Sequence, residues 1–201
     1  MKQVICSGAL IGLFASFAGC SASTTCSSAS FSSNNGNPAN VNYSTYNGGN
    51  VGPSVAQSFQ VSASSQILSV NLNLLKIGTL SAGYTLTVTL ETDNGASSPN
   101  DGPSGSVLAT SATIDPSTLS STAGSYKFSL SSSASLNPST SYWVRLRANY
   151  PASSSNYVQW TGYSGTSTYS LGHATIETGT ANAFTSGVLG GLESLDFSLG
   201  C

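Results

Sequence analysis

The chain has 201 residues, with five Lys or Arg, seven Asp or Glu and one His, and a formal net charge of −2. This weakly acidic balance argues against a nucleic-acid partner, because binding the phosphate backbone needs a basic face that releases counterions. Only 6% of the residues are charged, so the surface must be built from Ser, Thr, Asn and Gly. With Thr, Val, Tyr and Phe favouring pleated structure, the composition predicts one all-β domain preceded by a leader and a tether.

Residues 1–19 have the form of a secretory signal peptide. Lys2 supplies a positive charge, and residues 4–17 form an apolar run that is too short for a comfortable membrane span. The run ends in Phe17-Ala18-Gly19-Cys20, which resembles the lipobox of bacterial lipoproteins. The resemblance implies that Cys20 receives acyl chains that anchor the protein to a membrane, and Ser21 favours the outer membrane of the bacterial envelope. The alternative is an ordinary cleaved signal peptide with an incidental cysteine.

The cysteine count agrees with this prediction. Cys6 leaves with the signal peptide, and if Cys20 is acylated, Cys26 and Cys201 remain as one candidate disulfide in an oxidising compartment. The alternative is two unpaired thiols near the chain ends. The sequence has no CxxC motif and only one histidine, His173, which argues against a zinc site.

Residues 20–50 are rich in Ser, Thr, Asn and Gly and predict a lipidated N-terminus followed by a tether, with 41–43 as a candidate first edge strand. The predicted domain spans residues 51–201. Alternating apolar and polar residues predict about nine strands in it, at 55–61, 68–74, 84–91, 107–114, 126–130, 142–148, 157–160, 174–176 and 195–199. We expect an antiparallel β-sandwich or jelly roll, in which two sheets bury their apolar faces together.

The stretch from Leu136 to Trp160 predicts two strands joined as a hairpin. Because strand side chains alternate, the first strand has one apolar face and one face that carries Trp143, Arg145 and Arg147. We expect Trp143 to pack under the arginine stems. Asp196 is the candidate structural partner for one of the two guanidinium groups.

The order of several short motifs is similar to that in the choice-of-anchor domains of exported bacterial proteins. These motifs are Ala56-Gln57-Ser58-Phe59, Pro103 to Ala109, Tyr142-Trp143 and Leu195-Asp196-Phe197. In that family a jelly-roll-like module accompanies a cell-surface anchor. The resemblance therefore implies an exported, anchored sandwich, and it supplies no catalytic residues.

The sequence does not predict an enzyme. Nucleophilic serine catalysis needs a base, and the sole histidine, His173, is expected at the surface or at a strand end. The stretch Gly162-Tyr163-Ser164-Gly165 lacks the spacing of a nucleophile elbow. Glu193 and Asp196 are three residues apart, so on a continuous strand they face opposite sides and do not form a glycosidase pair.

Two low-specificity sites remain. Glu91, Asp93 and Asp101 in or beside the loop 92–105 are candidate calcium ligands, because Ca²⁺ prefers carboxylate and carbonyl oxygens. No ligand spacing is diagnostic, and a solvated polar loop is the alternative. No other cofactor is expected.

Trp160, Tyr163 and Tyr169 are candidate ligand contacts, because exposed aromatic rings on loops can stack on sugars and loops commonly carry recognition. The alternative is that Trp160 closes one end of the core. We therefore expect a non-catalytic binding or adhesion module for a glycan or a surface protein on a bacterial lipoprotein. A structural envelope lipoprotein and a secreted hydrolase are the alternatives.

Overall fold

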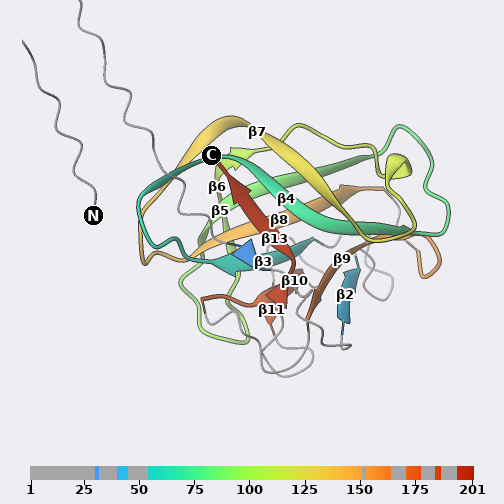
Figure 1. Cartoon of the computed structure of the whole chain (residues 1–201). Helices are drawn as coiled ribbons and strands as arrows, with labels where there is room; N and C mark the ends of the chain where they lie inside the picture. Colours follow the sequence, from blue (N-terminus) through green and yellow to red (C-terminus); the bar gives the residue numbers. More distant parts are fainter. Residues whose placement is uncertain are drawn as a thin grey trace, which may run out of the picture.

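A computed structural model describes residues 30–31, 40–44, 54–150, 153–163, 171–177, 184–186 and 194–201. As predicted, this part of the chain is all-β, with thirteen strands and one short 3₁₀ helix, Pro116–Thr118. The strands form two antiparallel sheets in a sandwich-like arrangement (Figure 1). No helix among these residues is long and apolar enough to span a bilayer.

The seven-stranded sheet is organised around one long strand, β4 (Ser65–Ile77). β4 pairs along one side with β7 (Gly124–Leu136), and along the other with β13 (Phe197–Gly200) and then β9 (Tyr157–Tyr163). The other members are β1 (Ser30–Phe31), β2 (Asn40–Ser44) and β12 (Ser194–Leu195). β1 pairs with β13, whereas β2 and β12 pair with β9. Thus β1 and β2, which lie within the stretch expected to form a tether, add strands to this sheet.

The six-stranded sheet has the order β11-β10-β3-β8-β5-β6. Its strands are β3 (Val55–Phe59), β5 (Thr85–Asp93), β6 (Pro103–Thr110), β8 (Tyr142–Asn149), β10 (Ala174–Glu177) and β11 (Phe184–Ser186). The predicted hairpin of β8 and β9 is wrong, because these strands lie in different sheets. Their apolar residues face the same core from opposite sides, so the chain changes sheet between them.

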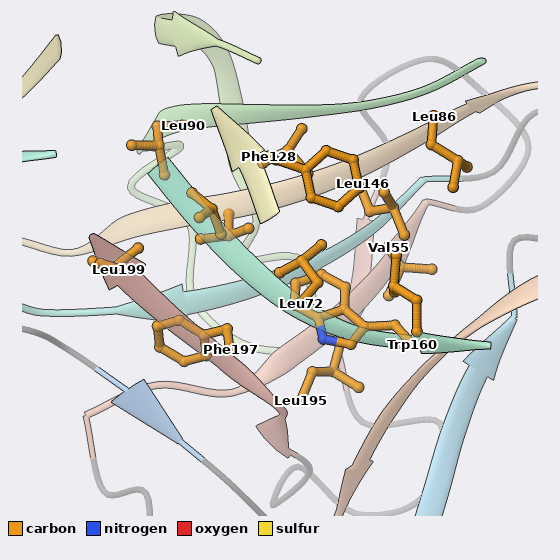
Figure 2. Packing of buried hydrophobic residues seen from close by; sticks show 14 of the residues in the cluster. Val55, Leu72, Leu86, Leu90, Phe128, Leu146, Trp160, Leu195, Phe197 and Leu199 are labelled. Atoms are coloured by element: carbon orange, nitrogen blue, oxygen red, sulfur yellow. The ribbon is translucent and has the colours of Figure 1, made fainter. Parts of the chain in front are cut away.

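The core lies between the apolar faces of the two sheets (Figure 2). Val55 and Leu146 come from the six-stranded sheet, and Leu72, Trp160 and Phe197 come from the seven-stranded sheet; all five are buried. Burying such side chains supplies about 1.5–3 kcal/mol each and accounts for the sandwich.

Two polar side chains form hydrogen bonds inside this core. The Nε1 of Trp160 donates to the carbonyl of Asp196 at 2.7 Å. The Oε1 of the fully buried Gln57 in β3 accepts from the amide of Leu195 in β12 at 2.7 Å. The second bond crosses from one sheet to the other and satisfies both groups, as a buried amide requires.

One alternation in β4 is broken. Simple alternation placed Leu68 on the same face as Val70, but Leu68 is 51% exposed. The pairing of β4 with β7 shifts register between Ile67 and Ser69. This β-bulge turns Ile67 toward the core and Leu68 toward solvent.

The strand registers separate the two ends of the sandwich. The loop 94–102 follows β5 at the end where β8 begins, because Thr92 lies opposite Tyr142. The turn 120–123 precedes β7 at the opposite end, since Gly124 lies opposite Leu74 near the end of β4. The two loops therefore lie at opposite ends of the sandwich.

Candidate functional site

Charged side chains gather on the outer face of the six-stranded sheet, away from the core. Arg145 in β8 lies opposite Ala56 in β3 and Thr89 in β5. Its neighbour two residues earlier, Trp143, lies opposite Glu91 and Ser58. The alternation predicted for β8 therefore holds, although the charged face is as deeply buried at Arg145 as the apolar one.

Arg145 joins two carboxylates. Its Nη2 lies 2.9 Å from Oε2 of Glu177 in β10, and its Nη1 lies 3.6 Å from Oε1 of Glu91 in β5. Its Nε donates to the Oγ of Ser54 at 2.6 Å, and this hydroxyl donates to Glu177 at 2.7 Å. Four strands or their ends are thereby tied through one guanidinium group.

Glu91 is fully buried and has a donor at each oxygen. Thr89 Oγ1 donates to Oε1 at 2.6 Å, and the amide of Gly105 donates to Oε2 at 3.0 Å. Arg147, which is 44% exposed, approaches Oε1 at 3.2 Å. Two guanidinium groups thus balance Glu91 and Glu177, as buried charges require.

The predicted pairing of Asp196 with an arginine is wrong. Asp196 lies between β12 and β13 of the other sheet, where its Oδ2 accepts from Thr161 Oγ1 at 2.8 Å. Arg145 instead pairs with Glu91 and Glu177. The two arginines on one face of β8 predicted that acidic partners were needed. The alternation within single strands could not show which strands would be neighbours.

Trp143 lies at the edge of the charged face that is nearest to the loop 94–102. Its Nε1 donates to Oδ2 of Asp93 at 2.8 Å. Its ring meets the imidazole of His173 edge-on, with centroids 5.2 Å apart and an interplanar angle of 87°. Trp143 is fully buried, so it anchors the base of the loop rather than offering a ring to a ligand.

His173 lies between a serine and a carboxylate. Its Nδ1 is 3.4 Å from Ser58 Oγ, and its Nε2 is 2.6 Å from Asp101 Oδ2, without the alignment of a hydrogen bond. The order of groups resembles a nucleophile–base–acid triad, which the sequence did not reveal because the three residues are far apart in the chain. However, Ser58 is only 4% exposed, and its Oγ accepts from the amide of His173 at 2.8 Å. A buried hydroxyl held by backbone cannot approach a substrate, so this contact ties β10 to β3.

The loop 94–102 is held by one asparagine. Asn94 Nδ2 donates to the carbonyl of Asn100 at 3.0 Å, and Asn94 Oδ1 accepts from the amides of Ala96 at 2.9 Å and Gly102 at 3.3 Å. The backbone amide of Asn94 also donates to the carbonyl of Gly102 at 3.0 Å. Residues 94–100 are all exposed. The loop is therefore both accessible and internally braced.

The structure does not gather the candidate calcium ligands. Glu91 is bonded to arginines, Asp93 to Trp143, and Asp101 contacts His173. Within the described ranges, no group of three or more His, Cys, Asp or Glu side chains could hold a metal ion. These carboxylates have protein partners that account for them.

The remaining predicted residues divide into three cases. Trp160 is fully buried in the core, so the packing alternative accounts for it. Tyr163 ends β9, but its side chain lies outside the described residues, as do Tyr169, Cys20 and Cys26. Cys201 is exposed at the end of β13.

Sequence reasoning missed Ser54, Ser58 and Glu177 as members of this face. The sequence feature that could have indicated them was the two positive charges on one face of β8, because these charges need carboxylates from neighbouring strands. Comparison with known proteins gives no match: no family model, no curated protein and no solved structure matches the chain.

Proposed function

We propose that this protein is a non-catalytic binding module, anchored by lipid to a bacterial cell envelope, that recognises a glycan or a surface protein through one end of its sandwich. The observation that carries the proposal is the loop 94–102, which is exposed over residues 94–100 yet braced by Asn94. A loop already held in one conformation loses little entropy when it binds. Loops on a rigid scaffold commonly carry recognition.

The chemistry of this loop favours an uncharged, hydrogen-bonding ligand. Residues 94–100 contain no Lys, Arg, Asp or Glu. Two carboxylates, Asp93 before the loop and Asp101 near its end, have partners inside the protein: Asp93 accepts from Trp143, and Asp101 contacts His173. A polymer with many hydroxyl groups fits such a surface. Tyr163 and Tyr169, in or beside the connection between β9 and β10, remain candidates for aromatic contact with the same ligand.

The binding experiment uses the soluble chain from Ser21 to Cys201 on a glycan array and on intact bacterial cells. In the test variant, residues 95–99 are replaced by a Gly/Ser segment of the same length. In the matched control, the exposed turn 120–123 at the opposite end is replaced in the same way. The proposal predicts binding by wild type and control, and loss of binding by the loop variant with a melting temperature close to that of wild type. Binding that the loop variant retains would contradict it.

The anchor is proposed from the leader. Acylation of Cys20 would place the chain on the envelope, with the outer membrane as the expected location. Intact-mass analysis of membrane-extracted protein should show a diacylglyceryl adduct, and Cys20→Ser should release the protein. A mature wild-type chain without the adduct would reject the anchor while leaving the binding proposal open.

A disulfide between Cys26 and Cys201 would fasten the domain close to that anchor. Support comes from β1, in which Ser30 lies opposite Ser198 of β13. Cys26 lies four residues before Ser30 and Cys201 three residues after Ser198 in the sequence, so both cysteines are close in the sequence to this pair. By the loop-entropy model the bridge stabilises by up to about 5 kcal/mol. A non-reducing peptide map that finds both thiols free would reject the pairing.

The finer fold assignment is also a proposal. Both sheets pair antiparallel, as a jelly roll requires, and the similarity to choice-of-anchor domains rests on the sequence motifs. An experimental structure of residues 21–201 would test both through its strand connectivity.

Two alternatives have distinct signatures. A structural envelope lipoprotein would bind no glycan on the array, and its attachment to cells would depend on the lipid anchor alone. A hydrolase would have to use Ser58, His173 and Asp101, which lie in the order of a triad although Ser58 is buried. It predicts turnover of a generic ester that Ser58→Ala abolishes, whereas the binding proposal predicts no turnover in either protein.

A further inference from the structure

We propose that Asn94–Gly95 is a site of covalent self-modification by deamidation, and that the hydrogen bonds that brace the loop 94–102 hold this site unreactive. In an Asn-Gly pair the asparagine side chain is open to attack by the next backbone nitrogen, because glycine has no side chain to hinder the approach. Both residues lie in the exposed part of the loop. The proposal concerns the chemistry of the loop and holds whether or not the loop binds a ligand.

The reaction is an internal substitution at the side-chain carboxamide of Asn94. The backbone nitrogen of Gly95 attacks Cγ of Asn94 and forms a new N–Cγ bond, which closes a succinimide ring. The Cγ–Nδ2 bond breaks, and Nδ2 leaves as ammonia with the proton that the Gly95 amide loses. Water then opens the ring at either carbonyl and yields aspartate or isoaspartate, so the step needs no oxidant, reductant or cofactor.

The conformation of the loop depends on both residues of this reactive pair. Gly95 has a φ of 71°, a left-handed conformation that residues with a side chain rarely adopt. Asn94 Nδ2 donates to the carbonyl of Asn100. Its Oδ1 accepts from the amides of Ala96 and Gly102. An ionised aspartate at position 94 would accept the last two bonds but would have no donor for the first.

Both reacting groups are already engaged in hydrogen bonds. The Gly95 amide donates to Oδ1 of Asp93 at 2.7 Å, and the carboxamide of Asn94 makes the three bonds described above. Ring closure has to turn the carboxamide toward the Gly95 nitrogen and remove the proton that Asp93 accepts. Because residues 94–100 are exposed, burial does not keep water from this site. The hydrogen bonds are therefore the feature of the loop that opposes the reaction.

The charge of Asp93 acts in the same direction. When the Gly95 amide loses its proton, negative charge develops on the nitrogen beside the Asp93 carboxylate, and like charges disfavour each other. This carboxylate is fixed in place, because its other oxygen accepts from Nε1 of the buried Trp143. Since a hydrogen bond to a charged group has to break, the folded loop should deamidate more slowly than an unfolded peptide by roughly tenfold or more.

The test follows deamidation of Asn94 in the soluble chain from Ser21 to Cys201 at mildly alkaline pH. Peptide mass spectrometry measures aspartate and isoaspartate at position 94 over time. A synthetic peptide with the sequence of residues 90–98 gives the rate without the brace. The wild-type chain should react roughly tenfold more slowly than the peptide. In Asp93→Ala, which removes the acceptor of the Gly95 amide, the rate should rise toward that of the peptide.

The matched control is Trp143→Phe. Both variants lose the hydrogen bond between Trp143 and Asp93, but only Asp93→Ala also removes the acceptor of the Gly95 amide. The control should therefore keep a rate close to that of wild type. Equal rates in the two variants would overturn the proposal.

The comparison of wild type with the peptide stands even where Asp93→Ala does not fold. A wild-type chain that deamidates at Asn94 as fast as the peptide would also overturn the proposal. A glycan array that finds no ligand for the wild-type chain would bear on the proposed function alone.

Discussion

The two tryptophans are both fully buried, but they are buried in different ways. Trp160 lies between the sheets among apolar side chains, and its Nε1 donates to a backbone carbonyl. Trp143 lies on the outer face of the six-stranded sheet, where its Nε1 donates to the carboxylate of Asp93. Beside it, Arg145 joins Glu91 and Glu177.

This difference shows how a chain with 6% charged residues uses its charges. The inner face of the six-stranded sheet is held by apolar burial, which needs no specific partner. The outer face is held by ion pairs and hydrogen bonds, each of which needs a particular partner at a particular distance. Removing one charged partner on the outer face should therefore reduce the free energy of unfolding by more than removing an exposed charge elsewhere.

The largest expected effect is that of Arg145→Ala. It leaves Glu91 and Glu177 without their shared cation in a buried setting, and we expect a loss of about 3–5 kcal/mol in the free energy of unfolding. Urea denaturation followed by circular dichroism measures it.

The matched control is Arg147→Ala, which removes a guanidinium that contacts the same Glu91 but is 44% exposed. It should cost less than about 1 kcal/mol. Equal effects of the two substitutions would break the comparison, because they would show that burial of Arg145 does not matter.

A second comparison uses the tryptophans themselves. Trp160→Phe should cost about 2 kcal/mol, because it leaves a cavity in the core and removes the donor to the carbonyl of Asp196. Trp143→Phe should cost about 1 kcal/mol, because the partly exposed Asp93 can be solvated when it loses its donor. Urea midpoints for both variants test this order, and a larger loss at Trp143 would reverse our view of the two faces.

The smallest expected effect concerns an exposed carboxylate. Hydrogen bonds from Ser117, with a further bond from the amide of Gly83, hold the pKa of Asp115 below its usual value. A lowered pKa in the folded state stabilises the protein above the usual aspartate pKa, and this contribution is lost as the pH falls through the folded value. Asp115→Asn should slightly reduce the fall in melting temperature between about pH 5 and 3. A fall identical to that of wild type would show that Asp115 contributes nothing measurable.

Much of the fold could be predicted from the alternation of side chains. The alternation of Thr85, Thr87 and Thr89 with buried leucine and valine marks β5, and that of β8 separates its apolar and charged faces. Leu68 shows the limit of this reasoning. The β-bulge beside it depends on how β4 pairs with β7, and the sequence pattern of β4 alone does not indicate it. The hairpin predicted for β8 and β9 was wrong for a similar reason, since alternation does not state to which sheet a strand belongs.

The charged site was less accessible to prediction. The excess of arginine on β8 indicated that acidic partners were needed, but their identity depends on the order β10-β3-β8-β5, which brings Glu177 and Glu91 to either side of Arg145. The neighbours of His173 depend in the same way on pairing between distant segments. The periodicity of a sequence indicates which side chains share one face of a strand. Which residues on other strands they contact depends on how the strands pair in the fold.

The measurement that tests the central claim most directly is a double-mutant cycle between Arg145→Met and Glu177→Gln, read from urea unfolding. If the outer-face charges hold the strands of the six-stranded sheet together, each single substitution should destabilise strongly, and the coupling energy should be about 2 kcal/mol. A coupling energy near zero, with both single variants as stable as wild type, would contradict the claim that these charges serve the fold.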